Sequence, residues 1–256
     1  MATATFRKSS ADAPDGFFAV EAAGLRWLAS SGAVTVPEVV AVDRTGITLE
    51  RIAEAPPTRA SAQQLGRGLA AMHRAGAPHH GAPPNGWPGD GFIATLPLPH
   101  RLVDDGRGWG AFYAEARLAP YLPRARDVGA VDAAGARTLD LVCARLADGS
   151  LGLPAEPPSR LHGDLWSGNV LWSTAGPVLI DPAAHGGHRE TDLAMLALFG
   201  LPHLDDVLAA YHEAWPLADG WRARVGLHQL HPLLVHAALF GGGYGARAVA
   251  AAARYR

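Results

Sequence analysis

The sequence predicts an α+β protein of two unequal lobes: a reduced, strand-rich N-terminal lobe and a larger, mainly helical C-terminal lobe. Two β-rich runs, 34–42 and 47–52, are joined by the turn 43–46 and are typical of a hairpin. A proline-marked break at 55–58 follows at once. Beyond this break the spacing of apolar residues becomes helical. We therefore place a boundary between the lobes at the break.

This boundary gives an N-terminal lobe of residues 1–54 and a C-terminal lobe of residues 55–256. In the first lobe we expect a strand at 5–8 and a helix that begins at Phe17 and ends near Gly32. A small sheet-containing lobe next to a helical one is typical of proteins that bind ligands in a cleft between lobes.

The second lobe is predicted to contain several helices, two short strands and a long loop. The segment 61–64 has a capping-box pattern that would start the first helix, which ends near Gly76. Further helices are expected at 107–118, 132–147, 190–199, 204–214 and 221–239. Strands are expected at 169–172 and 178–180, a long ordered loop at 77–100, and a simple tail of Ala and Arg at 246–256.

Composition excludes several classes of protein. The chain has 256 residues and a formal net charge of -2, which provides no field for nucleic acid or an anionic membrane. Cys143 is the only cysteine, so no internal disulfide forms and a cytoplasmic protein is the simplest interpretation. The first residues lack the apolar core of a signal peptide, and no apolar stretch is long enough to span a membrane.

The chemistry is concentrated in the segment 162–169, which reads His-Gly-Asp-Leu-Trp-Ser-Gly-Asn. Asp164 and Asn169 stand five residues apart, and Asp181 ends the second of the two short strands that follow. In kinases, an aspartate in this order accepts the proton of the substrate hydroxyl, and the later Asn and Asp hold Mg²⁺. Each piece alone is also typical of a turn or a strand end. In this order and spacing they predict phosphoryl transfer from ATP to a hydroxyl group.

Lys8 is the single lysine in a chain with 22 lysines and arginines. Where surface cations are arginines by default, a retained lysine indicates a place that needs a compact charge, such as a phosphate contact. Lys8 on a strand followed by Glu21 on a helix fits the lysine–glutamate pair with which kinases orient phosphates. The alternative is that Lys8 is an ordinary surface residue.

Three segments give the sequence a resemblance to a known family. The segment 162–169, followed by Ile-Asp-Pro-Ala at 180–183 and Gly-His-Arg-Glu-Thr-Asp-Leu-Ala-Met at 187–195, resembles the fructosamine (ketosamine) kinase family. That family belongs to the aminoglycoside-phosphotransferase group of protein-kinase-like folds. Weaker similarity extends over 109–120 and 21–25, so the resemblance covers most of the chain. It implies ATP- and Mg²⁺-dependent phosphorylation of a sugar hydroxyl on a fructosamine or ribulosamine, either a small molecule or linked to a protein.

The resemblance also implies roles for individual residues. Asp164 would be the catalytic base, Asn169 and Asp181 the Mg²⁺ ligands, and Trp166 a wall of the sugar pocket. The nucleotide would be bound by Lys8, Glu21, Glu50 and Ile52, the last two through the hinge segment 49–52.

The run that follows, His188 to Asp192, is harder to divide into roles. His188 is counted with Trp166 as a substrate residue, although its role and that of Arg189 stay open. We expect Glu190 and Asp192 to be mainly structural and to support the catalytic loop, because polar residues at a helix start also supply caps and ion pairs.

The sequence departs from the family pattern at its beginning. Only five residues precede the segment Phe6-Arg7-Lys8, whereas kinases of this shape carry two strands and a glycine-containing turn before the lysine. This departure predicts either a start codon assigned too far downstream or a kinase without a lid over the phosphates. It leaves open a weak or inactive nucleotide-binding protein.

Two further alternatives concern the acceptor and a metal. The acceptor could be an aminoglycoside, choline or another small alcohol instead of a ketosamine. The pairs His185/His188 and His228/His231 have the spacing of zinc ligands, although histidines at such positions are more often part of a packed core.

Overall fold

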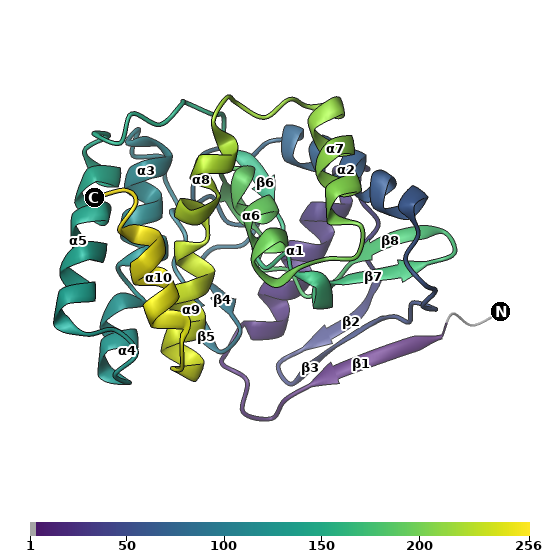
Figure 1. Cartoon of the computed structure of the whole chain (residues 1–256). Coiled ribbons are helices and arrows are strands. Elements are labelled where there is room, and N and C mark those ends of the chain that lie inside the picture. The colour runs from purple at the N-terminus through teal and green to yellow at the C-terminus, as the bar shows by residue number, and fades with distance from the viewer. Residues whose placement is uncertain (1–3) are drawn as a thin grey trace.

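The structure is a computed structural model that describes residues 4–256. Its N-terminal part is an antiparallel sheet of β1 (Thr5–Ser9), β2 (Val39–Asp43) and β3 (Gly46–Glu50) in the order β1–β3–β2. The helix α1 (Phe17–Ala29) follows β1 and lies beside this sheet (Figure 1). The predicted first strand, hairpin and helix are confirmed.

Alternation along β3 explains why the sheet and α1 pack together. Ile47 and Leu49 are two residues apart, so both project from the same face of the strand. They are buried in one apolar cluster with Phe18 and Leu25 of α1. Lys8 lies opposite Ile47 in the β1–β3 register, which fixes its position along the sheet.

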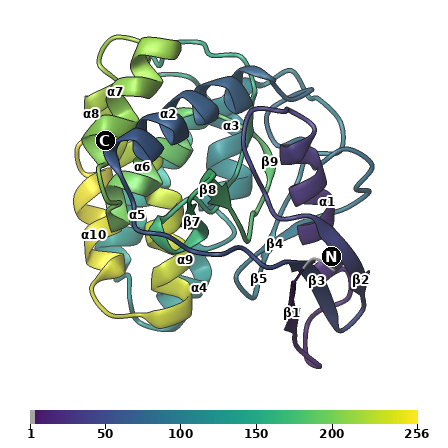
Figure 2. The ribbon, with the colours of Figure 1, turned by 90° about the vertical axis from the view of Figure 1, so that its right-hand side faces the viewer.

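The helices of the larger part were predicted from apolar spacing in most cases. They are α2 (Arg59–Arg74), α3 (Gly108–Phe112), the π-helix Tyr113–Leu118, α4 (Leu122–Asp127), α5 (Ala133–Ala147), α6 (Glu190–Phe199), α7 (Leu204–Ala214), α8 (Trp221–His228), α9 (Leu230–Phe240) and α10 (Tyr244–Ala252). Figure 2 shows α2 and α7 side by side at the top of the molecule, above α6.

The start of α2 differs from the prediction. The helix begins at Arg59, and its capping box joins Thr58 and Ser61, whose hydroxyls each accept the other's backbone N–H. The expected box at 61–64 is therefore wrong by one turn. The reason is that the Thr58 backbone is extended, as a cap residue requires.

The segment 77–100 is not only a loop, because it contains the hairpin of β4 (Gly91–Ile93) and β5 (Leu96–Leu98). These strands have three residues each and Pro97 stands within the second, so no alternating pattern is long enough to be recognised.

Three helical features were also missed in the sequence. The predicted helix 221–239 is two helices that meet at Gln229, with Pro232 in the first turn of α9, where its missing N–H costs no helical bond. The expected tail forms α10, because Ala248 and Ala252 lie on one face and are buried. The short helix α4 was not expected.

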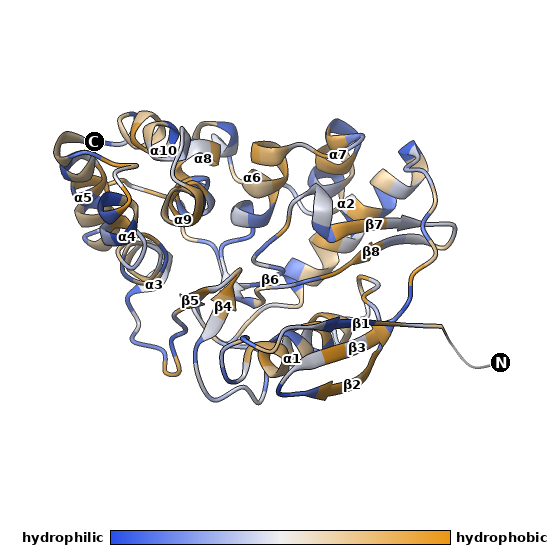
Figure 3. Ribbon diagram, turned by 90° about the horizontal axis from the view of Figure 1, so that it is seen from below, coloured by the Kyte–Doolittle hydropathy of each residue, from blue (hydrophilic) through white to orange (hydrophobic). Residues whose placement is uncertain are grey.

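Two two-stranded sheets complete the fold, and each carries part of the 162–187 region. They are β6 (Ser159–Leu161) with β9 (His185–Gly187), and β7 (Val170–Ser173) with β8 (Gly176–Leu179). Only β7 and β8 were predicted. Seen from below, these strands and the β4–β5 hairpin lie between the β1–β3–β2 sheet with α1 on one side and the helices on the other (Figure 3). The lobe boundary after residue 54 stays a prediction.

Over residues 4–256, no helix combines the length and apolar character that a segment crossing a bilayer requires.

Buried histidines predict that the fold is sensitive to acid. Burial lowers the pKa of His231 to about 3 and that of His100 to about 4, with the charge of Arg117 adding to both effects. An unfolded histidine titrates near 6.5, so their stabilising effect is present above that pH and is lost as the pH falls toward 4. We expect urea melts to show a free energy of unfolding that falls by about 1.4 kcal/mol per pH unit for each such histidine.

A matched pair of variants tests this assignment. Below pH 6.5, His231→Gln should reduce the slope of the free energy of unfolding against pH by about 1.4 kcal/mol per pH unit, which is the contribution of one proton. His203→Asn, at an exposed position with a left-handed backbone that Asn tolerates, should leave the slope unchanged. Equal slopes for His231→Gln and the wild type would contradict the prediction.

Candidate active site

The loop that carries Asp164 is held in place through its backbone. Asp192, fully buried on α6, accepts hydrogen bonds from the backbone N–H groups of His162 at 2.8 Å and Gly163 at 3.0 Å. Gly163 has a φ of +81°, and a Cβ there would collide with the backbone oxygen of Ala183. The expected supporting role of Asp192 is visible in these contacts.

His162 ties the same loop to the end of the β7–β8 hairpin. Its Nε2 is 2.9 Å from the carbonyl oxygen of Ile180, and its Nδ1 is 3.3 Å from the backbone nitrogen of Asp164. Burial lowers the pKa of His162, so the ring is neutral and donates from Nε2 while Nδ1 accepts. One neutral ring therefore connects the Asp164 backbone to the strand that precedes Asp181.

The carboxyl group of Asp164 is fixed by Asn169. The Nδ2 of Asn169 donates to Asp164 Oδ2 at 3.1 Å and to the Asp164 carbonyl oxygen at 2.8 Å. Burial raises the pKa of Asp164 to about 6, against the opposing effect of this hydrogen bond. A carboxylate with a raised pKa accepts a proton more readily, which is the property that a general base requires.

Asp181 and Lys8 form an ion pair beside this loop. Lys8 Nζ lies 3.1 Å from Asp181 Oδ1 and 2.9 Å from Glu21 Oε2. Burial lowers the pKa of Lys8, but the charges of Glu21 and Asp181 raise it more, so the lysine stays protonated. Asp181 has a φ of +52°, and such strained backbone in a non-glycine residue is concentrated at functional sites.

These side chains line one cavity of about 220 Å³. Its walls include Lys8, Glu21, Asp164, Asn169 and Asp181, all of which were selected from the sequence. They come from β1, α1, the 162–169 segment and the end of the β7–β8 hairpin. The fold thus brings together residues that are up to 173 positions apart in the chain.

A second cavity, of about 520 Å³, shares Lys8 and Asp181 with the first. Glu50 and Ile52, the predicted hinge residues, lie on its wall together with Leu49 of β3 and with Arg51 and Glu54 of the segment that follows. Within residues 4–256, the backbone N–H of Ile52 donates to no protein acceptor. This arrangement leaves a backbone donor and an apolar wall next to Lys8.

Trp166 lines the first cavity, and 40% of its surface is exposed. Its ring lies over Gly168, where any Cβ would overlap the ring. The glycine therefore lets the indole lie close against the loop.

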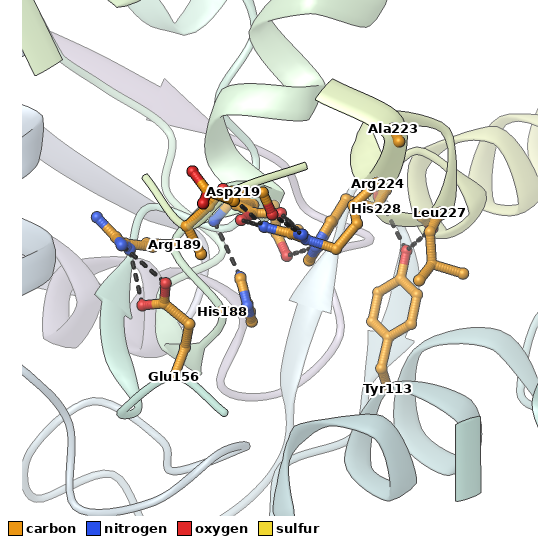
Figure 4. A network of polar contacts seen from close by, with 12 residues as sticks. Tyr113, Glu156, His188, Arg189, Asp219, Ala223, Arg224, Leu227 and His228 are labelled. Atoms are coloured by element: carbon orange, nitrogen blue, oxygen red, sulfur yellow. Dashed lines mark hydrogen bonds and ion pairs between the residues drawn. The ribbon is translucent and has the colours of Figure 1, made fainter. Parts of the chain in front are cut away.

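His188 is not brought together with the other predicted site residues. It is 4% exposed and lines a different cavity, which is formed by the segments 107–110 and 145–156. Its ring contacts those of Trp109 and His228, and its Nδ1 accepts the backbone N–H of Glu190. Figure 4 shows His188 and His228 within the same polar network. Its proposed substrate role stays a prediction.

The histidine pairs considered for zinc do not form as pairs. Among residues 4–256, the group with ligand-like spacing is instead His188, Glu190 and His228. Its carboxylate is already engaged, because Arg224 donates to both oxygens of Glu190 at 2.9 Å and 2.6 Å (Figure 4). A guanidinium at this position repels a divalent cation, so the group is better described as a buried ion-pair network.

Sequence reasoning missed one contribution to the site and one buried ion pair outside it. Phe92, Ile93 and Ala94 of the β4–β5 hairpin line the first cavity, and Phe92 packs on Phe17 with ring centroids 5.4 Å apart. Arg189 forms a bidentate pair with Glu156 at 2.8 Å and 2.7 Å. The hairpin has no motif, and partners 33 residues apart leave no local pattern.

Comparisons with known proteins assign the chain to a family. The family model described as fructosamine kinase matches residues 2–255. The chain belongs to the fructosamine kinase family. The resemblance first seen in the 162–195 region is thereby confirmed over nearly the whole chain, and the protein is a phosphotransferase with an alcohol group as acceptor.

Individual relatives agree with the family assignment. A probable ketoamine kinase of Thermus thermophilus is 36% identical over 238 residues, which is 93% of this chain and 82% of the relative. The crystal structure of a candidate fructosamine-3-kinase from Thermobifida fusca is 50% identical, with a TM-score of 0.90, and the match covers 99% of this chain and 85% of that one.

More distant structures support the fold. The aminoglycoside phosphotransferase APH(4)-Ia has a TM-score of 0.62 at 14% identity, and the match covers 98% of this chain and 87% of that one. At this identity the likeness concerns the fold alone. The predicted two-lobed, protein-kinase-like α+β fold is confirmed.

Proposed function

We propose that the protein transfers the γ-phosphoryl group of ATP, with Mg²⁺, to a sugar hydroxyl of a ketosamine. The observation that carries this proposal is the single cavity lined by both Asp164, with a pKa raised to about 6, and the Lys8–Asp181 pair. A base and a phosphate grip in one cavity are what in-line phosphoryl transfer to a hydroxyl requires.

The donor set fits a hard divalent cation. Mg²⁺ takes oxygen ligands, and the Asp181 carboxylate and Asn169 Oδ1 are oxygen donors at the same cavity. Asn169 uses Nδ2 for its contacts with Asp164. Within the described residues, its Oδ1 accepts no hydrogen bond and is available to a cation. Asn169 and Asp181 would hold Mg²⁺, which when bound neutralises developing charge on the phosphates.

For the nucleotide, we propose the larger adjoining cavity. Glu50 and Ile52 would offer backbone groups to the adenine, and the apolar side chains around them would cover its faces. Lys8 lines both cavities, so its ammonium would contact the phosphates where the two cavities meet. Glu21 would keep the lysine oriented through the 2.9 Å contact.

For the acceptor, we propose that the sugar lies against the exposed face of Trp166. An aromatic face suits the apolar side of a sugar ring. The acceptor hydroxyl would then be placed near Asp164, whose carboxylate takes the hydroxyl proton as the oxygen attacks the phosphorus. His188 lines a different cavity, and its substrate role stays a prediction.

An ATP-consumption assay tests the proposal. Purified protein with Mg²⁺ should turn over ATP in the presence of fructoselysine or ribuloselysine, and Asp164→Ala should not. ATP binding by the wild type without turnover of any acceptor would favour a nucleotide-binding protein instead. Turnover with choline or an aminoglycoside but not with a ketosamine would show that the acceptor is wrong.

A second prediction concerns Lys8. Lys8→Ala removes a charge-assisted phosphate contact, which is worth about 1.5–3 kcal/mol, so kcat/KM for ATP should fall about ten- to hundredfold. Lys8→Arg should restore little of this loss, because a planar guanidinium does not replace a compact ammonium between two carboxylates. Initial rates against ATP concentration measure the effect.

The control for Lys8 is Arg44→Ala, which removes an exposed cation from the same lobe. Its ATP dependence should match that of the wild type. If Lys8→Ala also matched the wild type, Lys8 would be an ordinary surface residue.

A further inference from the structure

A line of aromatic rings leads away from the wall of the cavity. Trp166 meets Phe199 with ring centroids 6.3 Å apart, and Phe199 meets His236 at 4.8 Å. His236 in turn meets Phe240 at 5.6 Å and Tyr244 at 5.1 Å. Phe199 ends α6, the next two lie on α9, and Tyr244 begins α10; α9 and α10 pack side by side (Figure 1). We name Phe199, His236, Phe240 and Tyr244 the aromatic strip.

The aromatic strip is accessible to a ligand. Phe240 is 68% exposed, and the other three members are partly exposed. Burial lowers the pKa of His236, so this ring is neutral and adds apolar surface instead of charge. A single exposed apolar residue is ordinary, but a row of contacting rings that begins at a substrate cavity is typical of a binding surface.

We propose that the aromatic strip binds the peptide chain that carries the ketosamine on a lysine side chain. This inference rests on the proposed function and assigns a surface to the chain that carries the acceptor. A ketosamine carries an amine substituent, and when the sugar lies on Trp166 this substituent has to leave the cavity. The strip is the surface that continues directly from Trp166 through ring contact with Phe199.

The length of the strip fits a short segment of peptide. Phe240 lies no more than about 17 Å from Trp166 along the three ring-to-ring steps, so an extended chain of at most about five residues spans the distance. A free amino acid leaves most of this surface uncovered. A peptide with apolar residues next to the modified lysine covers it.

Charge at the far end indicates which peptide fits. Arg247 is exposed, and its guanidinium lies 6.0 Å from the centre of the Tyr244 ring. Within residues 4–256, no carboxylate pairs with it. The strip therefore matches a peptide whose end beyond the apolar residues carries an acidic side chain or the C-terminal carboxylate.

The test compares two acceptors in wild-type protein and in Phe240→Ala. One acceptor is fructoselysine, and the other is a hexapeptide with a fructosylated lysine, two aromatic residues and a terminal glutamate. Removing one ring of such a surface should raise KM for the peptide about three- to tenfold and leave kcat and the KM for fructoselysine unchanged. Phe240 is largely exposed, so the variant keeps its fold.

Two control variants test whether a change in KM is specific to the aromatic strip. Leu141→Ala, at an exposed apolar position on α5, should change neither KM. Arg247→Gln should raise KM for the peptide with the glutamate but not for the same peptide with glutamine at that position.

Two outcomes would overturn the inference. One is an equal change, or none, for both acceptors in Phe240→Ala. The other is the same Kd of wild-type protein and Phe240→Ala for the fluorescein-labelled peptide. Fluorescence anisotropy measures this Kd and needs no turnover. Wild-type protein that phosphorylates neither acceptor would instead count against the proposed function, and the anisotropy measurement would still decide whether the strip binds the peptide.

Discussion

Asp164→Asn should lower kcat about 10²- to 10⁴-fold while the protein stays folded and binds ATP with nearly unchanged affinity. A general base contributes about this factor, and the amide of Asn accepts no proton at neutral pH. The substitution keeps the volume of the side chain, and an amide oxygen still accepts the hydrogen bond from Asn169 Nδ2. Steady-state kinetics, a urea melt and ATP titration measure the three properties.

The pH dependence provides a second measurement on the same variant. The carboxylate acts as a base only when it is deprotonated, and burial raises its pKa to about 6. The activity of the wild type should therefore be lost as the pH falls through 6, whereas the residual activity of Asp164→Asn should lack this step. A near-normal rate in the variant, or the same step in both proteins, would show that Asp164 is not the base.

The site residues that could be predicted from the sequence are those that lie close to one another in the chain or on successive elements. Asp164, Asn169 and Asp181 lie within 18 residues, and their spacing reflects one loop and one hairpin. Lys8 and Glu21 could be paired because a strand and the next helix hold them at a fixed separation, and the structure places them 2.9 Å apart. Such pairs are recognised from their spacing along the chain, because the geometry of one loop, hairpin or strand–helix unit sets that spacing.

The parts that could not be predicted depend on contacts between distant segments. The β4–β5 hairpin lines the cavity and packs through Phe92 on Phe17, 75 positions earlier in the chain. Glu156 and Arg224 belong to no sequence motif. Each forms a buried ion pair, with Arg189 and Glu190 respectively, that exists only in the folded chain. The aromatic strip joins residues of three helices, so no single segment contains its pattern.

Arg224→Met should destabilise the protein by about 3–5 kcal/mol. Glu190 is 3% exposed, and Arg224 donates to both of its oxygens, so the variant leaves a buried carboxylate without its main partner. Burial raises the pKa of Glu190, but His228 and Arg224 together hold it below its usual range. The free energy of unfolding from urea melts at neutral pH measures the loss.

The double variant Glu190→Leu/Arg224→Met should recover most of this stability, because an apolar pair of similar volume needs no compensating charge.

The activity of the double variant is the more informative result. Glu190 begins α6, and Asp192, two residues later, holds the catalytic loop through the N–H groups of His162 and Gly163. If the ion pair only stabilises the fold, the double variant should be both stable and active. A stable double variant with kcat reduced tenfold or more would show that the pair also sets the position of α6, and through Asp192 the position of Asp164. A double variant as unstable as Arg224→Met would contradict the account of the pair as a buried charge that needs its partner.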